Sequence, residues 1–245
     1  MSNKILFVFE GEKTEKQITD NLQKYFVSEN SIIHCAYCAD VYQLYEQINE
    51  DEDLDTFQLL KERGQNEKVL SEYKRSDFAE IYLFFDYDGH ATSADDDKIE
   101  RILSFFNEET SVGKMYISYP MVEALKHCSD EIDFRKLKVE AKKNISYKQL
   151  VNSEAHKTLK QITKYTKEIW IQLIDLHVGK MNYIFRNNFS IPSEMIFQNA
   201  IFQKQVEKYI KIDSTVAVLS AFPIFLFDYY GSKYISNLLS DSKIP

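Results

Sequence analysis

Two short apolar runs that end in acidic residues constrain the fold of this chain more than any other feature. Glu10 follows the run at residues 5–9, and Asp86 and Asp88 follow the run at residues 81–85. Runs this short, rich in β-branched and aromatic residues, predict buried parallel strands. Ligands of open α/β sheets bind outside the carboxyl ends of the strands. We therefore expect these three carboxylates at the ligand-binding edge of a parallel sheet.

Carboxylates gathered at one edge repel each other unless a cation lies between them, and oxygen ligands suit Mg²⁺ or Mn²⁺. Asp86 and Asp88 are two residues apart, so on an extended segment their side chains point the same way. Glu10 can complete the metal shell or act as a general acid or base. Metals held in this way neutralise phosphate charge and activate water. Lys13 is near enough in sequence to contact a phosphate.

The first half of the chain alternates strand and helix patterns. Strands are expected at residues 4–9, 32–38, 80–85 and 114–118, with helices at 15–26, 42–49 and from about 95 to 106. This alternation predicts a parallel sheet flanked by helices. Beyond Pro120 the patterns favour helix almost throughout. We expect an α/β catalytic domain at residues 1–130 and an all-helical, partly Lys-rich domain at 131–245.

Charge is distributed unevenly along the 245 residues, whose net charge is −8. Residues 1–134 hold 13 basic and 29 acidic side chains, whereas residues 135–211 hold 15 basic and 6 acidic ones. Such asymmetry is typical of proteins with a surface for nucleic acid, although solvated helices produce it too. The candidate phosphate-binding lysines of the basic region are Lys142, Lys143, Lys157, Lys160, Lys164 and Lys167.

The glutamate–glycine pair at Glu10 and the later D-x-D at Asp86 and Asp88 resemble the signature of the Toprim domain. The longer segments E-G-E-K-T-E, F-D-Y-D-G-H and Y-P-M-V-E-A-L are most similar to RloB-like, OLD-type and abortive-infection Toprim nucleases of bacterial defence. The resemblance covers about residues 4–127. Tyr119 stands where that family carries an asparagine, so the match of the third segment, with Glu123, is weaker.

The resemblance implies a functional role for each matching residue. Glu10 would be a metal ligand or general acid/base, and Asp86 and Asp88 would bind the metal. Glu123 would support the metal site or position the substrate. Glu15 and His90 are further candidates, His90 as a proton shuttle beside the aspartates. The family also implies a toxic effector in anti-phage defence, restrained or triggered by a partner such as an ATPase.

Two other motif interpretations compete with this one. Residues 84–89 also resemble the nucleophile motif of haloacid-dehalogenase-type phosphatases, in which the first aspartate forms a phosphoryl-enzyme. That interpretation leaves the Glu10 segment unexplained. Gly11 and Lys13 suggest a P-loop, but the required G-x-x-x-x-G-K-[ST] is absent and the neighbouring glutamates repel nucleotide phosphates. A partner-binding subunit of a defence complex with a silent acidic site is a third alternative.

The sequence thus predicts a Mg²⁺- or Mn²⁺-dependent nuclease acting on DNA or RNA, including tRNA. Three cysteines fit a reducing compartment. No apolar run approaches the roughly 20 residues of a membrane span. We expect a cytoplasmic protein with no membrane contact. The apolar residues near the C-terminus could form core or a homodimer surface.

Overall fold

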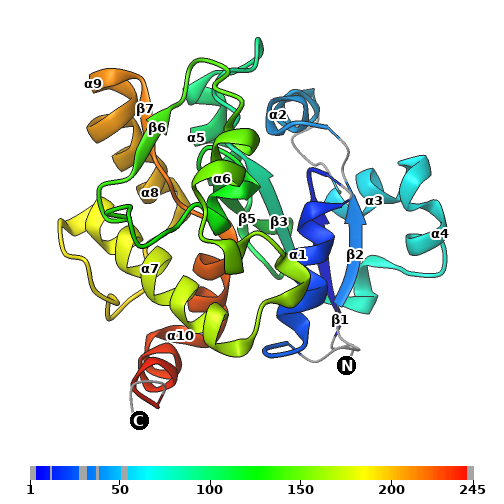
Figure 1. Ribbon diagram of the computed structural model, residues 1–245. Helices are drawn as coiled ribbons and strands as arrows, with labels where there is room; N and C mark the ends of the chain where they lie inside the picture. Colours follow the sequence, from blue (N-terminus) through cyan, green and yellow to red (C-terminus); the bar gives the residue numbers. More distant parts are fainter. Residues whose placement is uncertain (1–3, 12, 28–31, 37–38, 51–54, 242–245) are drawn as a thin grey trace. The chain divides into compact units, whose positions relative to one another are not determined.

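The structure of the protein is a computed structural model that describes residues 4–11, 13–27, 32–36, 39–50 and 55–241 (Figure 1). Contacts within the chain divide it into two compact units. The first comprises Met1–Asp86 and Ser93–Tyr116, and the second comprises Tyr87–Thr92 and Ile117–Pro245. The domains expected from the sequence place their division at residue 130. In the structure the segment that carries Asp88 and His90 belongs to the second unit.

A mixed five-stranded sheet forms the first unit and continues into residues 117–118. Its strand order is β2-β1-β3-β5-β4. β1 lies between β2 and β3 and pairs in parallel with both, and β4 and β5 are antiparallel. The α/β fold expected from the sequence is thereby confirmed in its coarse form. The strands are β1 (Lys4–Phe9), β2 (Ile32–Ala36), β3 (Phe78–Asp86), β4 (Asn107–Glu108) and β5 (Gly113–Ser118).

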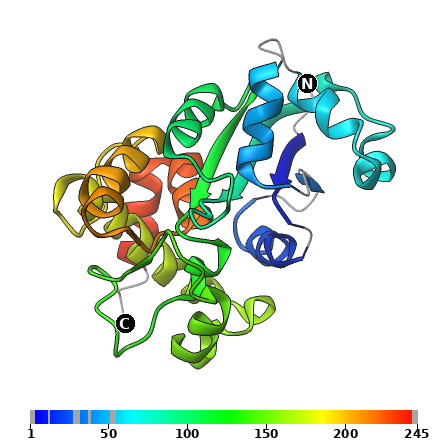
Figure 2. The same ribbon diagram turned by 90° about the horizontal axis from the view of Figure 1, so that it is seen from above.

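Helices cover both faces of this sheet. In Figure 2, α1 lies on one side of β1, and α2 and α5 lie on the other. The pattern follows from right-handed crossovers, because the chain moves in one direction across the sheet from β1 to β2 and in the other from β2 to β3, which puts the connecting helices on opposite faces. The helices of this unit are α1 (Thr14–Gln23), α2 (Val41–Glu50), α3 (Thr56–Lys61), α4 (Glu67–Leu70) and α5 (Asp96–Phe105), with short 3₁₀ turns η1 (Gly64–Asn66) and η2 (Arg75–Asp77).

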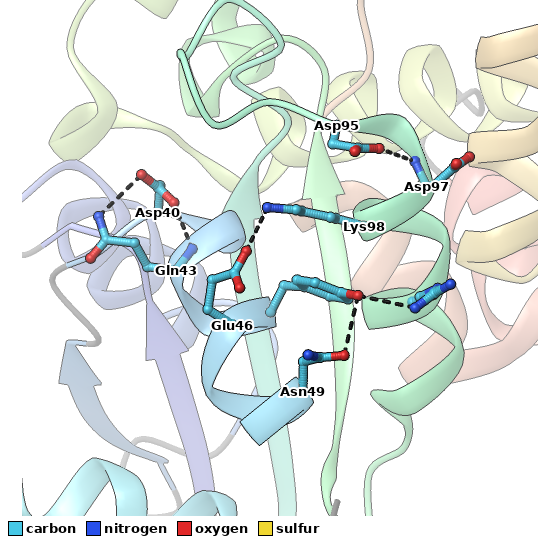
Figure 3. A network of polar contacts seen from close by, with 9 residues as sticks. Asp40, Gln43, Glu46, Asn49, Asp95, Asp97 and Lys98 are labelled. Atoms are coloured by element: carbon cyan, nitrogen blue, oxygen red, sulfur yellow. Dashed lines mark hydrogen bonds and ion pairs between the residues drawn. The ribbon is translucent and has the colours of Figure 1, made fainter. Parts of the chain in front are cut away.

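Polar contacts fix α2 and α5 beside each other (Figure 3). The carboxylate of Asp40 accepts the Gln43 backbone N–H at 2.9 Å and so caps α2. Asp95 caps α5 in the same manner. Between the helices, Lys98 Nζ lies 2.5 Å from Glu46 Oε1. This exposed pair orients the two helices, but solvent limits what it adds to stability.

Aromatic rings pack along the central strands. The Phe7 and Phe84 ring centroids are 5.1 Å apart, and Phe84 stacks on Tyr116 at 5.7 Å. All three side chains are buried. Each contributes about 2 kcal/mol through removal of its apolar surface from water. This packing aligns β1, β3 and β5, and therefore the residues that follow β1 and end β3.

The second unit is mostly helical. α7 and α10 pack against each other, and Trp170 of α7 is fully buried. Gly231 kinks α10 with a φ of 78°. No helix in the described part of the chain is long and apolar enough to cross a membrane. The elements are η3 (Val122–Lys126), α6 (Tyr147–Glu154), η4 (Lys157–Leu159), η5 (Ile162–Lys164), α7 (Lys167–Arg186), α8 (Gln198–Gln205), the π-helical η6 (Val206–Ile210), α9 (Lys211–Asp213) and α10 (Ala221–Asp241).

The prediction of an all-helical C-terminal region is wrong in one respect. A two-stranded antiparallel sheet joins β6 (Lys138–Glu140) to β7 (Thr215–Ala217), with Val139 opposite Val216. Each strand has three residues, too few to show a period of two against the surrounding helical patterns. The pairing joins segments more than 70 residues apart, so tertiary packing rather than local preference selects the strand conformation.

A buried histidine joins three segments of the second unit. His177 Nδ1 accepts the Ser220 backbone N–H at 3.0 Å, and Nε2 lies 3.4 Å from the Leu125 carbonyl oxygen. The side chain is completely buried. Burial lowers the pKa of His177 from 6.5 to about 3. The neutral ring, with its proton on Nε2, satisfies both contacts, whereas protonation of Nδ1 would break the first.

We therefore predict that acid destabilises the protein through His177. Between pH 6.5 and 3 the unfolded chain binds a proton at this residue that the folded chain does not, so stability falls as pH falls. Through His177 the free energy of unfolding falls by about 2 kcal/mol between pH 7 and pH 5. Urea unfolding at several pH values would measure it. His177→Asn retains an acceptor near the Nδ1 position but cannot titrate, and should flatten this part of the profile. An unchanged pH slope in that variant would contradict the assignment.

Candidate functional site

The first unit brings Glu10 and Asp86 together. Glu10 directly follows β1, and its backbone N–H donates to the Phe84 carbonyl oxygen at 3.2 Å. Asp86 is the last residue of β3, and its backbone N–H donates to Glu10 Oε2 at 3.0 Å. The Glu10 carboxylate therefore lies across the end of β3. Asp86 is buried and Glu10 is half-buried, so neither charge is fully solvated.

Glu15 points back toward the same strand end. It lies in the first turn of α1, and its Oε1 accepts the Gly11 backbone N–H at 3.3 Å. A Cβ at Gly11 would itself lie 3.3 Å from both Glu15 carboxylate oxygens, so glycine leaves room for this close approach. The buried Glu15 side chain thus shapes the loop between β1 and α1. Lys13 is exposed at the start of that helix.

Asp88 does not lie on an extended segment, which corrects the expectation that it points the same way as Asp86. β3 ends at Asp86, and Asp88 has a φ of 42° in the left-handed region. Aspartate tolerates this conformation better than most residues. The Asp88 carbonyl oxygen accepts the Ala91 N–H at 2.9 Å, which closes a turn. The alternation of side chains along a strand therefore ends before Asp88.

Within this turn Asp88 and His90 form a pair. His90 Nδ1 lies 3.0 Å from Asp88 Oδ1, and both side chains are partly accessible to solvent. The Asp88 backbone N–H donates to the Pro120 carbonyl oxygen at 3.2 Å, which anchors the turn to the residue after the Tyr119–Pro120 cis peptide bond. With Nδ1 held by the carboxylate, Nε2 is the ring nitrogen oriented for proton transfer.

Glu123 is buried in η3 and belongs to a different cluster. Its Oε1 lies 3.5 Å from Lys148 Nζ. Burial lowers the pKa of Lys126, and the Glu123 charge opposes that effect. Lys126 Nζ donates to Asn152 Oδ1 at 3.3 Å. Within the second unit, these contacts make Glu123 a buried counter-charge that fixes η3 against α6.

The basic side chains are arranged less regularly than expected. Lys157 and Lys164 lie in the 3₁₀ turns η4 and η5, and Lys167 begins α7. Lys143, Lys157, Lys160, Lys164 and Lys167 are all exposed. Lys142 is half-buried, and its Nζ donates to the Tyr87 hydroxyl at 2.8 Å. That contact joins the segment after β3 to the loop after β6, and no local sequence pattern indicates it.

Oxygen ligands at the end of β1 and β3 have the chemistry that Mg²⁺ or Mn²⁺ requires. Among the residues that the structure describes, no three acidic, histidine or cysteine side chains gather closely enough to form a complete metal cage. Mg²⁺ commonly takes one or two carboxylates and completes its shell with water and substrate phosphate. Glu10 and Asp86 supply two carboxylates at one strand end, where the Glu10 carboxylate accepts the Asp86 backbone N–H, and two carboxylates are the number that this mode requires.

Comparisons with protein-family models, with curated proteins and with solved structures find no match to this chain.

Gly89 offers a test of the turn that holds Asp88 and His90. A Cβ at this position would lie 2.4 Å from the Tyr87 ring and 3.0 Å from the Ala141 carbonyl oxygen. We predict that Gly89→Ala destabilises the protein by roughly 1–3 kcal/mol through overpacking. Urea unfolding would measure the loss. The matched control is Gly64→Ala, where no atom lies within 4 Å of the new Cβ. If the two variants had the same free energy of unfolding, the prediction would be wrong, because the turn would have moved to accommodate the new Cβ.

Proposed function

We propose that this protein is a divalent-metal-dependent nuclease with a Toprim-like site. The single observation that carries the proposal is the hydrogen bond from the Asp86 N–H to the Glu10 carboxylate at 3.0 Å. It places the acidic end of β1 beside the acidic end of β3, at the carboxyl edge where α/β sheets bind ligands. Acidic side chains paired at such an edge are suited to a cation and a phosphate rather than to a neutral ligand.

Glu10 and Asp86 would hold Mg²⁺ or Mn²⁺, which would stabilise charge on the scissile phosphate and increase the acidity of bound water. Glu15 orients the loop that follows Glu10, because it binds the Gly11 N–H. Lys13 would contact a neighbouring phosphate from its exposed position. In this proposal Glu10 both binds the cation and orients the attacking nucleophile.

The Asp88–His90 pair would supply the proton for the leaving oxygen. Asp88 fixes the His90 ring through Nδ1 and leaves Nε2 for proton transfer. Nε2 would then donate to the departing oxygen, and the carboxylate would stabilise the charged ring before transfer. In the sequence a single residue, Tyr87, separates Asp86 from Asp88.

Glu10 also distinguishes the nuclease from the phosphatase interpretation. A phosphoryl-aspartate at Asp86 would carry its charge beside the Glu10 carboxylate, which already accepts the Asp86 N–H. Like charges this close are unfavourable unless a cation lies between them. A cation held by Glu10 and Asp86 would give Glu10 a function that the phosphatase mechanism does not.

The exposed lysines of the second unit support a polyanionic substrate. Phosphate contacts from exposed lysines add affinity that does not depend on sequence. Resemblance to defence Toprim proteins further suggests a toxic effector, active on DNA or RNA and controlled by a partner. These assignments belong to the proposal and share its test.

We predict that Glu10→Gln and Asp86→Asn each lower Mn²⁺-dependent cleavage of DNA or RNA by about a hundredfold or more, since each removes a charged ligand or base. Cleavage of labelled single-stranded and duplex substrates would measure the loss. Glu72→Gln makes the same change on an exposed residue of the first unit and should leave the rate unaltered. Calorimetry should show weaker Mn²⁺ binding only in the first two variants.

Expression in cells separates the catalytic proposal from its rivals. A nuclease should arrest growth, and Glu10→Gln or Asp86→Asn should relieve the arrest. Toxicity that survives both substitutions would favour a partner-binding subunit. Hydrolysis of a small phosphomonoester that is lost in Asp86→Asn but retained in Glu10→Gln would favour the phosphatase.

The His90 assignment makes a separate prediction. His90→Gln should lower the maximal cleavage rate by about a hundredfold, because it removes the proton donor but not the metal ligands. Mn²⁺ affinity should stay at the wild-type value. His156→Gln is the control, since that histidine lies elsewhere in the second unit. A substrate with a more acidic leaving group should recover much of the lost rate in His90→Gln alone. If His90→Gln cleaved the substrate with the more acidic leaving group no faster than the ordinary substrate, His90 would not be the proton donor.

A further inference from the structure

An open cavity of about 470 Å³ lies beside Asp88 and His90 in the second unit. This volume is within the usual range for sites that bind small organic molecules. Besides Asp88, His90 and the carboxylate of Glu140, its lining combines three kinds of side chain. The apolar ones include Pro120, Met121 and Ile145, the amides are Asn144, Gln149 and Asn152, and the cationic ones are Lys143 and Lys148.

Apolar side chains of this kind suit the faces of a nucleobase. Pro120 is buried, Met121 and Ile145 are half-buried, and all three line the cavity. Tyr147 adds an aromatic side chain, and its hydroxyl is held 2.9 Å from His127 Nδ1. Flat bases bind between aromatic and apolar side chains in enzymes that enclose a single base.

The amides present hydrogen-bond donors. Asn144 Oδ1 accepts the Ser146 N–H at 2.9 Å, and Asn152 Oδ1 accepts from Lys126 Nζ at 3.3 Å. No hydrogen bond among the described residues uses the amide nitrogen of either asparagine. Each is therefore available to donate to a base carbonyl or ring nitrogen.

The rim is suited to a phosphate. Lys143 and Lys148 are exposed there and are only loosely paired, at 4.0 Å from Glu140 and 3.5 Å from Glu123. The first turn of α6 also lines the cavity, and Ser146 precedes it with no side-chain cap. Uncapped N–H groups at a helix start attract anions. Walls that suit a base and a rim that suits a phosphate thus occur in one cavity.

We propose that this cavity binds one unpaired nucleotide of the substrate strand, with its base inside and its phosphate at Lys143 and Lys148. A base enclosed in such a cavity must leave its stack and its partner strand. The cavity therefore selects single-stranded or frayed nucleic acid and positions it beside the Asp88–His90 pair. This inference rests on the proposed nuclease function and adds its substrate class.

The test measures binding of a short fluorescent single-stranded oligonucleotide to the protein. The buffer contains Ca²⁺ in place of Mn²⁺, so that binding is measured without cleavage. Gln149→Glu places a negative charge in the cavity at a position where a helix start tolerates it well. We expect binding about tenfold weaker than for Gln161→Glu, which is the same substitution on an exposed residue outside the cavity. Ile145→Trp fills the apolar part and should weaken binding to a similar degree.

Competition distinguishes a nucleotide site from a phosphate site. Nucleoside monophosphates should displace the oligonucleotide at lower concentrations than inorganic phosphate, and a blunt duplex of the same sequence should bind less tightly than the single strand. Equal competition by inorganic phosphate would overturn the proposal. So would unchanged binding in both Gln149→Glu and Ile145→Trp. Circular dichroism of each variant establishes that it is folded.

The two proposals fail in different ways. If binding depended on the cavity but Mn²⁺ produced no cleavage, the nuclease proposal would be contradicted and the nucleotide site would be supported. Cleavage in Mn²⁺ with binding that ignores both cavity substitutions would contradict the nucleotide site alone.

Discussion

The parallel pairing of β1 with β3 is the constraint on which the proposed chemistry depends. It aligns Phe9 with Phe84, so the residue after β1 reaches the backbone at the end of β3. The Glu10 carboxylate then accepts the Asp86 N–H without any long loop or flexible arm. Two acidic groups 76 positions apart in the sequence become neighbours because a buried apolar ladder leaves no other register. A slip of one residue would turn the core aromatics toward the opposite face.

The sequence predicted the first unit well for the same reason. Apolar runs such as residues 5–9 and 81–85 are short, uninterrupted and bounded by polar turns, so their strand character is decided locally. The helix starts at Asp40 and Asp95 were also predictable, because an aspartate cap acts within three residues. Those signals need no information about distant parts of the chain.

Other features were beyond sequence reasoning because they depend on long-range packing. Val139 pairs with Val216 across the second unit, and neither three-residue strand has a visible period. The left-handed backbone of Asp88 follows from the turn anchored at Pro120 and not from the D-x-D spacing. The contact between Lys142 and Tyr87 likewise joins residues that no short motif connects.

The two aspartates of the D-x-D motif are consequently selected by different physical demands. Asp86 ends a strand in ordinary extended backbone, where its charge is what distinguishes it from other residues. Asp88 occupies a conformation that β-branched and bulky residues avoid, and asparagine shares its tolerance of that conformation. Sequence drift at the two positions should therefore differ. At position 88 an asparagine or glycine would keep the turn and remove the charge. At position 86 either residue would remove the charge that the proposed site requires, although the strand could remain.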